Sequence, residues 1–155
     1  MTRVLERDPA CGLCASLEMV EPLWVNDLWC VRPIDPPLGV AGWMLLVSQR
    51  HCPGPALFDD EEARSFGPVL RHLEATLLRV TGALRIYTAA LGEAQKHFHC
   101  HMVPRYAEMP KNAVGWGVFD LQRAAQAGEV VVDPDHAAGI QAAYAEALRR
   151  EPPPR

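Results

Sequence analysis

Three histidines alternate with apolar residues in the stretch HFHCHMVPR, residues 97–105. Successive side chains of a strand point to opposite faces, so His97, His99 and His101 share one face if this stretch is extended. Three imidazoles on one surface are typical of a metal site, or of a catalytic site with a histidine nucleophile. Three exposed histidines without a role are the third interpretation, and the strict alternation argues against it.

The residues between the histidines are Phe98, Cys100 and Met102. They would form the opposite face of the same strand, and we expect that apolar face to pack under a helix. The histidine face would then line a cleft, because three buried rings without partners would be costly.

A second group that could do chemistry is the pair Cys11 and Cys14 in CGLC. This spacing occurs by chance, in redox motifs and in zinc sites. A redox motif would need a strand–helix unit around it, and none is recognisable before residue 20. A zinc site would need two further ligands from elsewhere in the chain.

Composition restricts the class of protein that carries these groups. The chain has 155 residues, of which 49% are hydrophobic and 22% charged, which fits one soluble globular domain. A net charge of -4 argues against a nucleic-acid partner. No apolar run is long enough for a membrane span, and the charged N-terminus is unlike a signal peptide. We therefore expect a cytoplasmic protein without a membrane partner, whose five cysteines are thiols or metal ligands.

Several extended segments are needed to position the histidines. Residues 22–33, PLWVNDLWCVRP, predict two short strands around Asn26 and Asp27, which tolerate the left-handed backbone of a tight turn. The other predicted strands are residues 43–48, 83–91, 97–105 and 128–134.

The main predicted helix begins at Asp59 or Asp60, where acidic residues favour an N-terminus, and stops at Gly82. Pro68 conflicts with this helix, because it should kink the helix or mark its first turn. Two more helices are predicted, over residues 119–127 and 133–151. Short connections between these elements indicate an α+β domain, with one main helix on an antiparallel sheet.

Residues 97–103 match the signature of the histidine triad (HIT) family, in which three histidines alternate with apolar residues and two more apolar residues follow. GWMLLVSQRH, residues 42–51, resembles the family's strand that ends in a basic residue and a histidine. LFDDEEA, residues 57–63, resembles the start of its helix. The resemblance covers roughly residues 10–105, and 106–155 form a C-terminal extension.

This resemblance implies a single HIT-like domain over residues 1–155. Its fold would be a five-stranded antiparallel sheet with one main helix and a C-terminal helix. The resemblance also implies a homodimer, in which two such sheets meet across a two-fold axis.

Enzymes of this family are implied to attack the α-phosphorus of a nucleoside phosphate derivative, with a purine nucleoside expected here. A nucleotidyl-histidine forms, and water then releases a nucleoside monophosphate. By position, His99 would be the nucleophile and His101 would donate a hydrogen bond to the phosphate. Neutral histidine suits this chemistry near pH 7, because its ordinary pKa of about 6.5 leaves one ring nitrogen free.

A zinc-bearing branch of the family supplies the two ligands that the cysteine pair lacks. The implied set is Cys11, Cys14, His51 and His97. Four such ligands close a tetrahedral site, so the zinc would be structural.

The stretch before the triad departs from the family pattern. Gly92 stands at the glycine position, but Glu93 replaces the usual glutamine and Ala94 the usual hydroxyl residue. We expect Gly92 and Gln95 to contact the nucleotide, with Gln95 or Lys96 taking over the missing contacts. The expected reaction is hydrolysis of nucleoside phosphoramidates or dinucleoside polyphosphates. The alternatives are a nucleotide-binding module with poor turnover, and a metalloenzyme that uses all three histidines of the triad.

Overall fold

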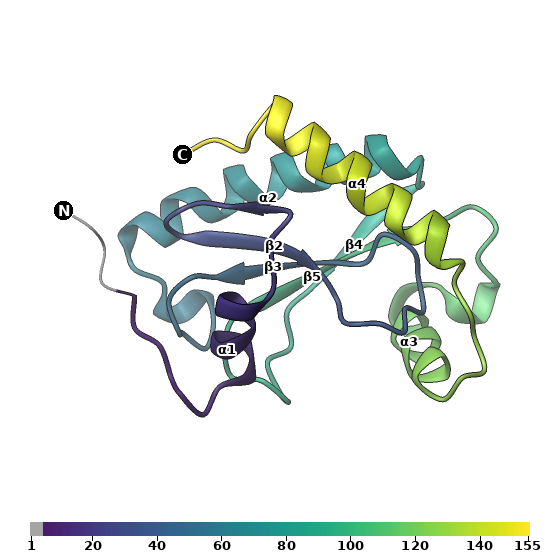
Figure 1. Ribbon diagram of the computed structural model, residues 1–155, viewed down its shortest axis with the longest axis horizontal. Coiled ribbons are helices and arrows are strands. Elements are labelled where there is room, and N and C mark those ends of the chain that lie inside the picture. The colour runs from purple at the N-terminus through teal and green to yellow at the C-terminus, as the bar shows by residue number, and fades with distance from the viewer. Residues whose placement is uncertain (1–4) are drawn as a thin grey trace.

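The computed structural model of the protein describes residues 5–155. At its centre is a five-stranded sheet with the strand order β1-β2-β3-β5-β4, antiparallel throughout (Figure 1). The strands are β1 (Trp24–Val25), β2 (Trp29–Pro33), β3 (Met44–Ser48), β4 (Arg85–Ala89) and β5 (His99–Arg105). The predicted α+β class and five-stranded sheet are confirmed.

Four helices accompany the sheet, and none of them is long and apolar enough to cross a membrane within the described part of the chain. They are α1 (Gly12–Met19), α2 (Asp60–Thr81), α3 (Val118–Gln126) and α4 (Pro134–Arg150). Short 3-10 turns are η1 (Pro55–Leu57), η2 (Lys111–Ala113) and η3 (Gly115–Gly117). The predictions did not include α1, because an eight-residue helix without a side-chain cap leaves little pattern in a sequence.

The predicted hairpin between β1 and β2 is confirmed, but its turn is built differently. Asn26 accepts hydrogen bonds on its side-chain oxygen from the backbone N–H groups of Leu28 and Trp29, at 2.9 and 2.7 Å. Among residues 5–155 only glycines have positive φ angles, so Asn26 and Asp27 do not adopt the predicted left-handed backbone. The asparagine side chain holds the turn instead.

Helix α2 has the predicted boundaries. Asp59 caps it in a reciprocal capping box with Glu62, and Gly82 ends it with a left-handed φ of 66°. Pro68 lies on the exposed side of the helix, which continues through it. Pro68 therefore does not mark the first turn. Proline has no N–H to donate to the carbonyl one turn earlier, but water can reach that carbonyl on the exposed side.

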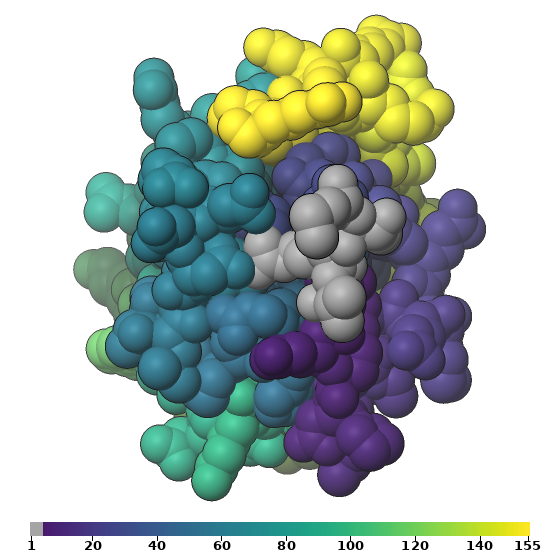
Figure 2. All heavy atoms as spheres, turned by 90° about the vertical axis from the view of Figure 1, so that its left-hand side faces the viewer, coloured from purple at the N-terminus to yellow at the C-terminus, as the bar shows by residue number. Residues whose placement is uncertain are grey.

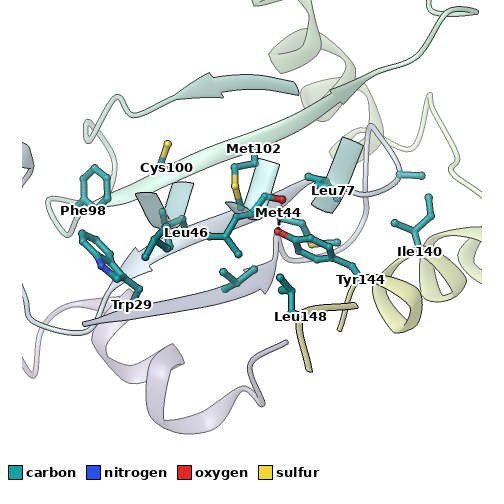
Figure 3. Close-up of a cluster of buried hydrophobic side chains, with 14 of the residues drawn as sticks. Trp29, Met44, Leu46, Leu77, Phe98, Cys100, Met102, Ile140, Tyr144 and Leu148 are labelled. Carbon is teal, nitrogen blue, oxygen red and sulfur yellow. Dashed lines mark hydrogen bonds between the residues drawn. The ribbon is translucent and has the colours of Figure 1, made fainter. Parts of the chain in front are cut away.

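One face of the sheet packs against α2 and α4, and the main core lies between them. Phe98, Cys100 and Met102 are buried in this core, as the alternation in the sequence predicted (Figure 3). The helices and the neighbouring strand contribute further buried side chains, which are Met44, Leu46, Val69, Leu73, Leu77, Ile140, Tyr144 and Leu148. Each large apolar side chain buried here stabilises the fold by about 1.5–3 kcal/mol.

The other face of the sheet carries His99 and His101, which pair in register with Val47 and Leu45 of β3. Helices α1 and α3 lie on this side, near opposite ends of the sheet (Figure 1). A second, smaller core connects α3 to the sheet and contains Val40, Trp43, Val103 and Val118.

The strand predicted at 128–134 is wrong. Residues 128–133 hold no strand and lead from α3 into α4, with Val131 85% exposed. Three consecutive valines favour extended backbone, but that preference yields a strand only beside a pairing partner.

Candidate functional site

The four residues predicted as metal ligands converge at the start of β5. The donor atoms of Cys11, Cys14, His51 and His97 all lie within 4.8 Å of one another. Cys11 immediately precedes α1 and Cys14 lies in its first turn, so this short helix presents both thiols. The described N-terminal segment packs against the chain that follows β3, where the His51 N–H donates to the Glu6 carbonyl at 2.9 Å (Figure 2).

His97 is fully buried, and its ring has a defined orientation. Nε2 lies 2.8 Å from the Ser48 carbonyl oxygen, which can only accept, so the ring proton sits on Nε2. The lone pair of Nδ1 then faces the thiols, at 3.3 Å from Cys14 Sγ and 3.6 Å from Cys11 Sγ. Burial lowers the pKa of His97, which favours the neutral, metal-binding form.

This orientation corrects two expectations about the triad. His97 precedes strand β5, and its fully buried ring contacts the thiols and the Ser48 carbonyl, so it does not line an open cleft as expected. Within residues 5–155 the one group that could hold a metal is the cysteine–histidine cluster, so the interpretation as a three-histidine metal site is wrong.

The surroundings of Cys14 suit a bound cation. Burial raises the pKa of the Cys14 thiol, although the Asp8 N–H donates to its sulfur at 3.4 Å and favours a thiolate. His51 Nδ1 lies 3.4 Å from the same sulfur. Two sulfurs and two imidazole nitrogens in a closed set are compatible with a zinc ion, whose charge would stabilise both thiolates.

His99 and His101 are half-buried neighbours on β5, with ring centroids 5.2 Å apart. His99 Nδ1 lies 2.8 Å from the carbonyl oxygen of His97, so Nδ1 carries the proton and donates it. In the neutral ring the lone pair of His99 is therefore on Nε2. Such a neutral imidazole, with one nitrogen anchored and the other free, can act as a nucleophile.

Aromatic side chains pack around His101, and the sequence analysis did not predict these contacts. Trp43 Nε1 donates to His101 Nδ1 at 3.0 Å, and the Phe119 ring meets His101 edge-on with centroids 5.5 Å apart. Trp116 is 71% exposed and stacks on Phe119 at 6.2 Å. Burial lowers the pKa of His101 to about 4, with His99 adding to the effect. The sequence offered one signal for this role of Trp43, which is its position directly after a glycine at the start of the buried strand.

The predicted nucleotide contacts Gly92 and Gln95 lie in the loop before β5. Gly92 has a φ of 71°, a backbone conformation that favours glycine. The Gln95 carbonyl oxygen lies 4.0 Å from Cys11 Sγ, so this side chain borders the cysteine cluster. Glu93 and Ala94 are both exposed. Contact of Gly92 and Gln95 with a nucleotide stays a prediction.

Solved structures of histidine triad proteins share this fold. A Zn-bound family member from Mycobacterium smegmatis superposes with a TM-score of 0.62 and 16% identity over 92% of this chain and 98% of its own. A histidine triad protein from Bradyrhizobium japonicum gives 0.63 and 22%, over 92% and 98% of the two chains. A hypothetical histidine triad nucleotide-binding protein from Sulfolobus tokodaii gives 0.65 and 13%, over 90% and 93%.

No protein-family model and no curated protein matches the chain. The likeness therefore rests on three-dimensional structure, and it extends over most of the 155 residues, the segment after residue 105 included. This chain has the fold of the histidine triad proteins.

Proposed function

We propose that this protein is a hydrolase of the histidine triad type that cleaves nucleoside phosphoramidates or dinucleoside polyphosphates. The observation that carries the proposal is the hydrogen bond from His99 Nδ1 to the His97 carbonyl oxygen at 2.8 Å. This bond leaves the Nε2 lone pair free in a half-buried position, which is the state that a nucleophilic imidazole needs.

In the proposed reaction, His99 Nε2 attacks the α-phosphorus of a purine nucleoside phosphate derivative. The Nε2–P bond forms while the bond from phosphorus to the leaving group breaks, and the leaving group takes the bonding electrons. Water then attacks the phosphorus and releases His99 and a nucleoside monophosphate. Overall, water supplies a hydroxyl to the phosphorus and a proton to the leaving group. His101 donates a hydrogen bond to a phosphate oxygen as charge shifts between these oxygens.

The cysteine–histidine cluster has a separate, structural role in this proposal. Cys11, Cys14, His51 and His97 hold one zinc ion, supported by their convergence within 4.8 Å and by the Zn-bound structural neighbour. A zinc ion with four protein ligands has no open position for substrate. The ion would tie the start of α1 to the residues that precede β5, and so stabilise the strand that carries His99.

We also propose a homodimer, formed through the face of α2 and the edge strand β4. Strand β4 ends the sheet, and Leu78 and Leu84 beside it are 38% and 60% exposed. Pairing would cover these side chains and the open edge. Light scattering at micromolar concentration should give twice the chain mass of 17.1 kDa, and a monomeric mass would contradict the dimer.

A reducing cytoplasm is the proposed location. None of the five cysteines forms a disulfide, which suits such a compartment. Fractionation of cells that express a tagged chain would test the location.

The test of the catalytic proposal is turnover of adenosine phosphoramidate and diadenosine polyphosphate by the wild type, His99→Ala and His136→Ala. His136 is an exposed histidine on α4 and serves as the matched control. We expect His99→Ala to lose about 10³-fold or more in kcat, with nucleotide binding largely kept, and the control to match the wild type. Full activity in His99→Ala would refute the mechanism.

The second candidate function is a nucleotide-binding module with poor turnover. Glu93 and Ala94 favour it, because the family's usual phosphate contacts are absent at these positions. Tight binding of a nucleoside monophosphate by a wild type that turns over neither substrate would select this alternative.

A further inference from the structure

A buried hydrogen bond joins Trp43 to His101. The Trp43 side chain is 1% exposed, and its Nε1 lies 3.0 Å from His101 Nδ1. An indole N–H can only donate, so His101 Nδ1 must accept, and the proton of the neutral His101 ring is on Nε2. His101 is therefore the opposite tautomer to His99, which carries its proton on Nδ1.

The ring of His101 is also held in place by its packing. Trp43 and Phe119 meet it edge-on, with centroids at 5.7 and 5.5 Å, and they meet each other edge-on at 5.4 Å. Phe119 belongs to α3, which the smaller core connects to the sheet. Rotation of the His101 ring would break both the packing and the hydrogen bond, so its Nε2–H group has a defined direction.

We propose that Trp43 is a positioning residue that fixes His101 as an Nε2–H hydrogen-bond donor beside the Nε2 lone pair of His99. The proposal rests on the proposed function and refines it. Both rings act through Nε2, which is the nucleophile in His99 and the hydrogen-bond donor in His101. This arrangement suits a phosphoryl group. The phosphorus is attacked by His99 while His101 donates to one of its oxygens.

The tautomer can be measured without a substrate. Nitrogen-15 NMR of histidine-labelled protein distinguishes a protonated ring nitrogen from an unprotonated one. We expect His101 in the wild type to have a protonated Nε2 and an unprotonated Nδ1 that is hydrogen-bonded to the Trp43 indole. In Trp43→Phe the Nδ1 signal should shift to that of a ring without this bond.

Trp29→Phe is the matched control. Trp29 is also fully buried, and its Nε1 donates to Ser65 Oγ at 2.9 Å, in the other core. Both variants lose one indole hydrogen bond and part of one buried ring, but only Trp43→Phe should change the His101 signals. With substrate, Trp43→Phe should lower kcat by about 10-fold and leave KM nearly unchanged, while Trp29→Phe keeps both constants.

A protonated Nδ1 on His101 in the wild type would overturn the proposal, even if Trp43→Phe failed to fold. Unchanged His101 signals in a folded Trp43→Phe would overturn it as well. A wild type without turnover that still has the expected tautomer would refute the proposed hydrolase activity and leave the role of Trp43 in place.

Discussion

His97 and His99 are two residues apart in the chain, yet they present opposite nitrogens to their surroundings. His97 donates from Nε2 to the Ser48 carbonyl and turns Nδ1 toward two thiols. His99 donates from Nδ1 to the carbonyl of His97 and keeps Nε2 free. Both residues are histidines, so the difference arises from the backbone carbonyl that each ring contacts. That carbonyl decides which ring nitrogen carries the proton and which is left with a lone pair.

Burial separates the two regions further. The metal region, which we define as Cys11, Cys14, His51 and His97, surrounds a fully buried imidazole with three other donors. The triad region, defined as His99 and His101, is half-buried. A run of three alternating histidines therefore contributes to two different environments, a buried cluster of cysteine and histidine donors and a half-buried pair of rings.

The largest expected effect on stability comes from the metal region. Cys14→Ala should reduce zinc from about one ion per chain to none, and lower the melting temperature by on the order of 10 °C, because binding of a structural metal contributes directly to folding. His99→Ala should keep the zinc and the melting temperature. Elemental analysis and calorimetry check both variants. Equal zinc content in the two variants would remove the distinction between the regions.

A smaller effect is expected beside the triad region. Ala94→Ser combined with Glu93→Gln restores the family's usual hydroxyl and removes a negative charge. We expect kcat/KM on diadenosine polyphosphates to rise by about 10-fold or more, because one charge-assisted hydrogen bond contributes about 1.5–3 kcal/mol. The gain on phosphoramidates with a neutral leaving group should be smaller, because such a group is not repelled by Glu93.

Kinetics on the two substrate classes check this double variant. Equal gains on both classes would keep the hydroxyl effect and dismiss the electrostatic one. No gain on either would show that Gln95 or Lys96 already supplies the contact, or that residues 92–96 do not correspond to the family's phosphate-binding stretch.

A further expected effect is a pH dependence from His101. Burial lowers its pKa to about 4 in the folded protein, whereas an unfolded histidine titrates near 6.5. The unfolded chain therefore binds more protons between these values, so folding stability falls as the pH falls from about 6.5 to 4. His101→Gln should show a shallower fall in urea unfolding across this window, and His136→Gln should follow the wild type. Parallel curves for wild type and His101→Gln would contradict the assigned shift.

Strong local signals made part of this structure predictable. Helix α2 could be predicted because Asp59 and Gly82 carry the chemistry of its two ends. The burial of Phe98, Cys100 and Met102 followed from a period of two. The four converging donors were found only because the resemblance joined Cys11 and Cys14 to two distant histidines.

The remaining features depend on tertiary contacts that a single sequence does not display. His97 is buried because its ring lies against the Ser48 carbonyl and the two thiols, and the Ser48 contact joins residues 49 positions apart. Trp43 reaches His101 because β3 and β5 are neighbours, and Phe119 reaches it because α3 packs on that face. The valines at 130–132 carried a clear local signal for a strand, but no neighbouring strand pairs with them.

The most direct test of the separation between the two regions is mass spectrometry of protein quenched in alkali during turnover, since a phosphorus–nitrogen bond to histidine is labile in acid. The wild type should carry one nucleotidyl group on the peptide that contains residues 97–105, and fragmentation should place that group on His99. An adduct on His97 or His101, or steady turnover with no adduct at any time, would contradict the assignment of His99 as the nucleophile.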